Sequence, residues 1–144
     1  MDGLHIKHRI ALPNSIILST SQKQQLAEHA KKSAPNEGCA LLLGKKNNNT
    51  VNVHEIFFAH NKDESPVNFT ISEEELIQQY RAAEQKKLDI VGIFHSHPDS
   101  QAIPSKTDKK FMHINPVVWV IYSNKEKNFM AYLFDSDVES VKII

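Results

Sequence analysis

Two histidines and an aspartate lie close together in the stretch HSHPDSQAIPSKTD, residues 95–108. His95 and His97 follow the β-rich run DIVGIF at the end of a predicted strand, where side chains two residues apart point to the same side of a sheet. A proline-containing loop then leads to Asp108, which faces the histidines if this loop folds over them. Two imidazoles and one carboxylate are a typical catalytic zinc set, in which the fourth coordination position is left for water.

Other ions suit these side chains less well. Magnesium or calcium would require several oxygen ligands and little imidazole. Structural zinc sites are usually rich in cysteine, and the single cysteine of this chain, Cys39, is far from the histidines in the sequence. The residue types therefore favour one catalytic zinc ion.

A water molecule activated by zinc also needs a base, and Glu37 is the candidate. This glutamate comes directly before the apolar run GCALLLG, which is typical of a buried strand. Its carboxylate is expected to take a proton from the water and to return it to a leaving amine. The hydroxyl of Ser105 is a candidate donor to the oxyanion that develops during the reaction.

Each of these signals also has a purely structural interpretation. Ser105 and Asp108 have the spacing of a capping box at the start of a helix. A His-x-His pair at the end of a strand is often exposed to solvent, and a glutamate after Pro35-Asn36 is often a turn residue. The combination of these residues in one chain is more specific than any one of them.

The elements that must position these residues follow from periodicity and turn signals. Residues 45–49 (KKNNN) are expected to form a turn and residues 61–71 an exposed loop. Ser72 and Glu75 indicate a second capping box, followed by an apolar stripe of Leu76, Ile77, Tyr80 and Ala83. Strands are expected at 15–19, 38–44, 50–61, 89–94, 116–123, 128–135 and 137–144, and helices at 21–33, 72–87 and 105–113. This mixture predicts an α/β or α+β fold, a central sheet with helices packed against it.

Composition narrows the range of functions. The 144 residues are expected to form one domain, and 17 basic residues balance 17 acidic ones, so no net field favours nucleic acid or an anionic membrane. No apolar run reaches the length of a membrane span, and the first residues lack the apolar core of a signal peptide. One cysteine fits a reducing compartment, so the cytoplasm is the expected location.

The remaining candidate residues have structural interpretations. Cys39 is expected to be a small core residue and not a nucleophile, and Trp119 is expected to lie in the core. Among the other histidines, His113 is the candidate for contact with a metal ligand, because it is close to the metal loop in the sequence. Structural or surface positions are expected for His5, His8, His29, His54 and His60.

The stretch from His95 to Asp108 resembles the signature of the JAMM (MPN+) metalloprotease family, H-x-H-x(10)-D with an inner Pro-Ser. The stretch PNEGCALLLG is similar to the upstream glutamate of that family, and the resemblance extends over essentially the whole chain. It implies a zinc peptidase on a cytidine-deaminase-like α/β/α sandwich with a central mixed sheet. It also implies that His95, His97 and Asp108 bind zinc. Glu37 would activate the water, and Ser105 would support the tetrahedral intermediate.

The resemblance also implies a class of substrate. Eukaryotic members of the family remove ubiquitin by cleaving isopeptide bonds, whereas single-domain archaeal and bacterial members cleave after the C-terminal Gly-Gly of ubiquitin-like or sulfur-carrier proteins. This chain is similar to the second group because only KKFMHIN separates Asp108 from Pro116. We therefore expect a deubiquitinase-like isopeptidase, with residues 61–71 holding the extended tail of the substrate.

Three alternatives stay open at this point. The first is a peptidase that trims one amino acid from the tail of a sulfur-carrier protein. The second is a non-catalytic scaffold of MPN type, although such modules lose the metal ligands that are present here. The third is a zinc deaminase, which would use a cysteine-rich metal set with a P-C-x-x-C motif that this chain lacks.

Overall fold

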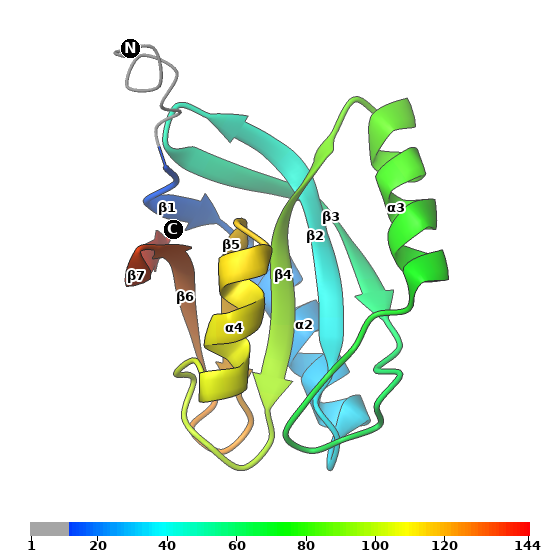
Figure 1. The fold of residues 1–144 in the computed structure, drawn as a ribbon, viewed down its shortest axis with the longest axis vertical. Helices are drawn as coiled ribbons and strands as arrows, with labels where there is room; N and C mark the ends of the chain where they lie inside the picture. Colours follow the sequence, from blue (N-terminus) through cyan, green and yellow to red (C-terminus); the bar gives the residue numbers. More distant parts are fainter. Residues whose placement is uncertain (1–11) are drawn as a thin grey trace.

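A computed structural model describes residues 12–144 as a seven-stranded sheet with three helices packed around it (Figure 1). His5 and His8 lie outside the described residues. The elements follow one another as β1 (Ser15–Ile17), α2 (Thr20–Ser33), β2 (Cys39–Asn47), β3 (Thr50–Ala59), α3 (Glu73–Gln85), β4 (Asp89–His97), α4 (Lys106–Ile114), β5 (Val118–Ser123), β6 (Asn128–Asp135) and β7 (Asp137–Ile143).

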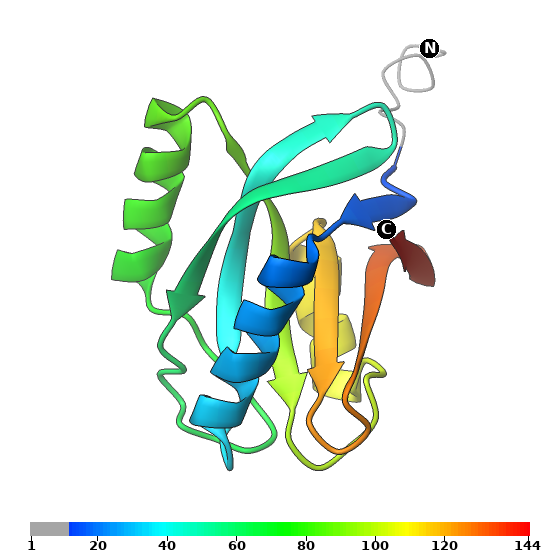
Figure 2. The same cartoon turned by 180° about the vertical axis from the view of Figure 1, so that it is seen from behind.

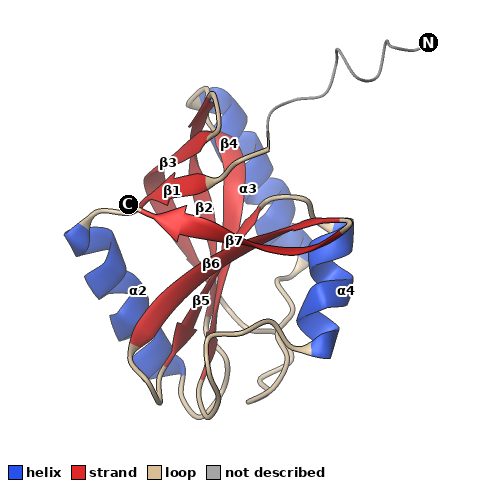
Figure 3. Ribbon diagram, turned by 90° about the vertical axis from the view of Figure 1, so that its left-hand side faces the viewer, coloured by secondary structure: helices blue, strands red, loops and turns tan. Residues whose placement is uncertain are grey.

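The sheet has the strand order β1-β3-β2-β4-β5-β6-β7 and closes on itself, because β1 pairs with both β3 and β7. The β4–β5 pair and both pairs of β1 are parallel, and the other pairs are antiparallel. Helix α2 lies on one side of the sheet, and α3 and α4 lie on the other (Figures 1, 2 and 3). The predicted α/β class with a central mixed sheet is confirmed.

The apolar run of β2 explains why helices cover both faces. Leu42 packs into the same core as Leu26 of α2, whereas Leu41 and Leu43 pack with Ala83 of α3. All three β2 leucines are at most 1% exposed. Since full burial of a leucine contributes about 1.5–3 kcal/mol, consecutive leucines hold the strand between two layers. This strand lies beside β4, which carries both histidines.

The turn predicted at residues 45–49 is present but shorter than expected. Strand β2 continues to Asn47, which pairs with Thr50, so the turn is reduced to Asn48 and Asn49. Asn48 has a φ of 59°, a left-handed conformation that asparagine adopts more readily than most residues. Polar side chains are tolerated on this part of the strand because it extends beyond the core, with Lys45 exposed.

The predicted apolar stripe of α3 is wrong in part. Ala83 is buried and Leu76 packs against the same core, but Ile77 is 51% exposed and Tyr80 is 60% exposed. The helix therefore contacts the sheet along a narrow stripe. Ser72 caps α3 through the first half of the predicted box, since its hydroxyl accepts from the Glu75 N–H at 3.2 Å.

Helix α2 begins at Thr20, one residue earlier than expected. Its N-cap is Ser19, which forms a capping box with Gln22: each side chain accepts from the backbone N–H of the other residue. Within residues 12–144, none of the helices has both the length and the apolar character needed to cross a membrane.

Candidate metal centre

His95 and His97 are the last residues on one face of β4, where the strand is fully inside the sheet. His95 pairs with Cys39 of β2 on one side and with Ile121 of β5 on the other. The two imidazoles point to the same side of the strand, and their Nε2 atoms are 3.1 Å apart. His95 is fully buried and His97 is 4% exposed, so the solvent-facing alternative for this pair is excluded.

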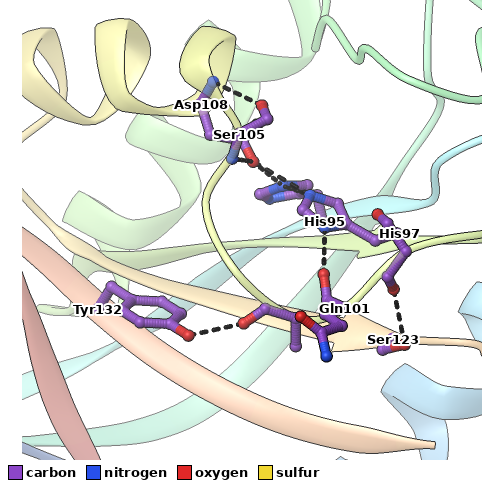
Figure 4. Close-up of polar contacts among 9 residues, drawn as sticks. His95, His97, Gln101, Ser105, Asp108, Ser123 and Tyr132 are labelled. Atoms are coloured by element: carbon purple, nitrogen blue, oxygen red, sulfur yellow. Dashed lines mark hydrogen bonds and ion pairs between the residues drawn. The ribbon is translucent and has the colours of Figure 1, made fainter. Parts of the chain in front are cut away.

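Asp108 lies in the first turn of α4 and completes the cluster (Figure 4). Its Oδ2 atom is 3.1 Å from Nε2 of His95 and 3.0 Å from Nε2 of His97. The same oxygen accepts a hydrogen bond from the backbone N–H of Ser105 at 2.9 Å. The capping box predicted at this helix is therefore present, and the oxygen that caps the helix also faces the histidines.

Ser105 is the N-cap of α4 and is exposed at the surface. Its Oγ accepts from the backbone N–H of Asp108 at 3.0 Å. The hydrogen of the hydroxyl is not used in that bond, so the group keeps a donor. The structure therefore places Ser105 beside Asp108, with its backbone N–H bonded to the carboxylate that faces the histidines.

Glu37 comes from the segment between α2 and β2 and is 3% exposed. One of its carboxylate oxygens lies within 4.8 Å of ring nitrogens of His95 and His97. Gly38 follows it without a side chain where space is short, since a Cβ there would lie 2.7 Å from Oγ of Ser33. The structure thus brings together the glutamate and histidines that are 58 and 60 positions apart in the sequence.

The electrostatics of the cluster are dominated by burial and by the two histidines around the carboxylate. Burial raises the pKa of Glu37 to about 8. Burial alone would also raise the pKa of Asp108, but hydrogen bonds with His95 and His97 hold it well below its usual range. Burial lowers the pKa of His95. Burial opposes the charge of His97 as well, but bonds with Asp108 and with a backbone carbonyl outweigh this and raise its pKa.

The donor atoms fit a zinc ion. Nε2 of His95, Nε2 of His97 and Oδ2 of Asp108 form a triangle with sides of 3.0–3.1 Å. Atoms bound to zinc tetrahedrally at about 2.0 Å lie about 3.3 Å from one another, close to these distances. The Nδ1 of His97 donates to the carbonyl of Gln101 at 2.7 Å, so in the neutral ring Nε2 carries a lone pair. With its lone pair at Nε2, His97 can bind a metal ion together with Nε2 of His95 and Oδ2 of Asp108.

Glu37 fits a position beside the ion better than a position on it. Ligand atoms in the group that contains Glu37 lie up to 4.8 Å from one another. Oδ2 of Asp108, in contrast, is 3.0–3.1 Å from the Nε2 atoms of the two histidines. Oε1 of Glu37 is buried and has no hydrogen-bond partner within residues 12–144. A buried carboxylate oxygen next to an ion site is suited to a water molecule between the two.

Aromatic residues surround the buried imidazole of His95. Phe69, from the loop between β3 and α3, stacks on it with a centroid distance of 4.9 Å and an angle of 23°. Trp119 meets it edge-on at 5.7 Å and is 1% exposed, which confirms its predicted core position. Both aromatic residues line an apolar cavity of about 220 Å³ that extends between α3 and α4 toward Phe111.

The other candidate residues lie away from the cluster or support it from the core. Cys39 is fully buried and burial raises its pKa to about 12, which confirms its interpretation as a core residue. His113 packs edge-on against Phe134 at 4.9 Å, which is a structural contact, and its candidate role beside a metal ligand stays a prediction. His29 bonds the carbonyl of Cys39 through Nε2 at 2.9 Å, and His54 and His60 are exposed.

Sequence reasoning missed three polar residues around the cluster. Ser96 lies between the histidines, and its Oγ accepts from the Gly38 N–H at 2.7 Å. Asn61 donates to the carbonyl of Glu37, and Tyr132 fixes the loop after His97. Only Ser96 is adjacent to a recognised motif. The bonds that connect the other two to the site reach carbonyls at least 24 positions away, so no local pattern marks this role.

Comparisons with known proteins identify relatives that align with most of this chain. A desampylase from Pyrococcus furiosus is 36% identical over 110 residues, which cover 75% of each chain. A CysO-cysteine peptidase from Mycobacterium tuberculosis is 25% identical over 111 residues, 77% of this chain and 75% of the relative. A solution structure of a protein from Desulfitobacterium hafniense has a TM-score of 0.81 and 27% identity, and covers 90% of this chain and 91% of that one.

Residues 19–135 match the family described as Prok-JAB, prokaryotic homologs of the JAB domain. The matched segment contains Glu37, both histidines of β4 and Asp108. It covers most of the chain, and the relative from Pyrococcus furiosus supports it independently. This chain therefore belongs to the prokaryotic JAB-domain family, as its resemblance to the JAMM signature implied.

Proposed function

We propose that this protein is a zinc-dependent peptidase that hydrolyses the amide bond after the C-terminal Gly-Gly of a ubiquitin-like protein. The observation that carries the proposal is the triangle of His95, His97 and Asp108 donor atoms with the buried carboxylate of Glu37 beside it. In this proposal the three residues of the triangle hold one zinc ion. The sheet lies between α2 on one side and α3 and α4 on the other (Figure 3). This arrangement supports a cytidine-deaminase-like sandwich as the scaffold of the site.

A zinc ion held by His95, His97 and Asp108 would supply Lewis-acid polarisation of the scissile carbonyl and would make a water molecule easier to deprotonate. Glu37 takes the proton of that water and delivers it to the leaving amine. In the metal-free protein, burial raises the pKa of Glu37 to about 8, a direction that favours a carboxyl group that can take up a proton. The Ser105 hydroxyl, whose hydrogen is not used in the helix cap, donates to the oxyanion.

Residues 61–71, within the loop between β3 and α3, hold the tail of the substrate in this proposal. The loop lies next to the buried imidazole, since Phe69 stacks on His95. A relative from Thermus thermophilus is named as a probable TtuB-protein conjugate cleaving protease and is 28% identical over 88 residues. That name supports cleavage of protein conjugates as the leading reaction, with a ubiquitin-like modifier and its conjugated protein as partners. A reducing cytoplasm fits the single buried cysteine.

The second candidate is removal of one amino acid from the tail of a sulfur-carrier protein. The name of the CysO-cysteine peptidase favours it, and this relative is similar over 77% of the chain. Both reactions use the same residues, because the acyl half of the scissile bond is the same. They differ only in the leaving amine, which is a lysine side chain in one case and a free amino acid in the other.

The test uses purified protein loaded with zinc and two substrates built on one Gly-Gly modifier. One substrate is a lysine conjugate, and the other carries a single extra C-terminal amino acid. Mass spectrometry identifies the released C-terminus, with and without a zinc chelator. We expect Glu37→Ala to retain zinc and lose cleavage, and His97→Ala to lose both. A wild-type protein without stoichiometric zinc would instead favour the non-catalytic scaffold. Wild-type turnover by Glu37→Ala would overturn the base assignment.

A further inference from the structure

Asn61 is a buried polar residue at the start of the loop between β3 and α3, and it is 7% exposed. Its Nδ2 donates to the carbonyl of Glu37 at 3.0 Å and to the carbonyl of Asn68 at 2.9 Å. Its Oδ1 accepts from the N–H groups of Asp63 at 3.0 Å and Thr70 at 3.2 Å. An amide side chain has two N–H donors and two acceptor lone pairs, so Asn61 uses its full bonding capacity here.

The backbone of Glu37 is held on both sides by this loop. Its N–H donates to the carbonyl of Ser65 at 2.8 Å, and its carbonyl accepts from Asn61. The next residue, Gly38, is tied to the histidine strand, because its N–H donates to Oγ of Ser96 at 2.7 Å. The Glu37 backbone is therefore bonded to the loop, and the residue that follows it is bonded to β4.

The far side of the same loop contacts a residue of the zinc triangle. Phe69, next to Asn68 and Thr70, stacks on the ring of His95 with a centroid distance of 4.9 Å. Figure 1 shows the loop in green, crossing from the end of β3 toward the end of β4 before it enters α3. One asparagine thus joins the loop segment that covers His95 to the peptide that carries Glu37.

We propose that Asn61 is a positioning residue that couples the conformation of the 60–72 loop to the placement of the Glu37 carboxylate. The inference rests on the proposed function for the role of Glu37. The zinc ligands come from β4 and α4 and make no hydrogen bond to the Asn61 side chain among the described residues. Loss of the Asn61 amide therefore displaces the base and the loop while the metal triangle stays in place.

The test is Asn61→Asp, which keeps the shape and the Oδ1 acceptor but removes the donor. In this variant an oxygen replaces Nδ2 and faces three carbonyl oxygens. In the wild type Nδ2 lies 3.0 Å from the carbonyl of Glu37, 2.9 Å from that of Asn68 and 3.4 Å from that of Ser65. We expect kcat to fall about 100-fold, the scale of a displaced catalytic group, with zinc stoichiometry unchanged. The matched control is Asn124→Asp, which removes an amide donor from the carbonyl of Ala30 and is expected to keep kcat.

Hydrogen exchange of the metal-free protein gives a readout that does not depend on activity. Asn61→Asp is expected to speed exchange of the Glu37 and Gly38 amides and of the loop, and to leave β5 and β6 unchanged. If the wild type cleaves neither substrate, the proposed function fails, while the exchange result still tests the coupling. Wild-type kcat in Asn61→Asp, or unchanged exchange at Glu37, overturns the inference. Should Asn61→Asp not fold, Asn61→Ser removes the donor without a buried charge and takes its place in both measurements.

Discussion

The Tyr132 hydroxyl is bonded to Ala102, and the neighbouring residue, Gln101, orients the imidazole of His97. The O–H of Tyr132 donates to the carbonyl of Ala102 at 2.7 Å, and the adjacent carbonyl of Gln101 accepts from Nδ1 of His97 at 2.7 Å (Figure 4). Ser123 fixes the other side of Gln101, since its Oγ donates to the carbonyl of Ser100 at 2.7 Å. Two hydroxyls from β5 and β6 thus fix the loop that sets the tautomer and the angle of an imidazole.

This relationship predicts that Tyr132→Phe weakens zinc binding. Removal of the hydroxyl frees the loop carbonyls, so His97 is held less firmly in the orientation that directs Nε2 toward Asp108. Groups that orient a metal ligand typically account for 10–100-fold in affinity, and we expect a loss of about tenfold. Competition with a chromophoric chelator measures the affinity. Tyr80→Phe, at a position 60% exposed on α3, is the matched control and is expected to bind zinc as the wild type does. Equal affinities for both variants would contradict the prediction.

The two roles of Ser105 can be separated by comparison with a second capped helix. Ser105→Ala removes the acceptor for the Asp108 N–H, which is expected to lower the free energy of unfolding by about 1 kcal/mol. If its hydroxyl also donates to the oxyanion, kcat falls a further 100-fold or so. Ser19→Ala is the control, because Ser19 forms the same capping box on α2. It is expected to lose similar stability and to keep kcat. Equal kcat values for both variants would leave Ser105 a helix cap only.

Ser96 is expected to stabilise the fold through the peptide that follows Glu37. Ser96→Ala leaves the Gly38 N–H without its acceptor inside a fully buried site, which destabilises by about 1–3 kcal/mol. Urea unfolding of the metal-free protein measures the loss. Ser33→Ala is the comparison, since its hydroxyl donates to the His29 carbonyl within helix α2 and its removal leaves no N–H unpaired. A loss at Ser96 no larger than at Ser33 would count against this account.

Short sequence patterns predicted those parts of the site whose residues are close together in the sequence. The spacing of His95 and His97 on one strand follows from the period of a strand, and the Ser105–Asp108 box follows from helix capping. The polar residues 45–47 were predicted as a turn because side chains beyond the core carry no apolar signal, although the backbone pairing with β3 continues. Ile77 and Tyr80 have helical spacing, but their exposure depends on how α3 meets the sheet.

Residues that act through tertiary contacts could not be predicted in this way. Asn61 bonds a carbonyl 24 positions earlier in the chain, and Tyr132 bonds one 30 positions earlier. The sequence around an asparagine that precedes a polar loop does not distinguish a solvent-facing side chain from a buried one that bonds distant carbonyls. The proximity of Glu37 to the histidines was inferred from a family resemblance, because its own surroundings in the sequence indicate only a turn before a strand.

The raised pKa of Glu37 predicts how the stability of the metal-free protein depends on pH. Burial raises it from 4.5 to about 8, so between these values the folded state retains a proton that the unfolded state releases. This contribution to stability is complete below pH 4.5 and is lost as the pH rises to 8. Glu37→Gln removes the ionisation, so its advantage in melting temperature over the wild type is expected to grow from pH 5 to pH 8. Glu28→Gln, on the exposed side of α2, controls for the loss of one negative charge. Thermal melts in excess chelator provide the measurement, and parallel pH profiles for Glu37→Gln and the wild type would show that the buried carboxyl is not held protonated.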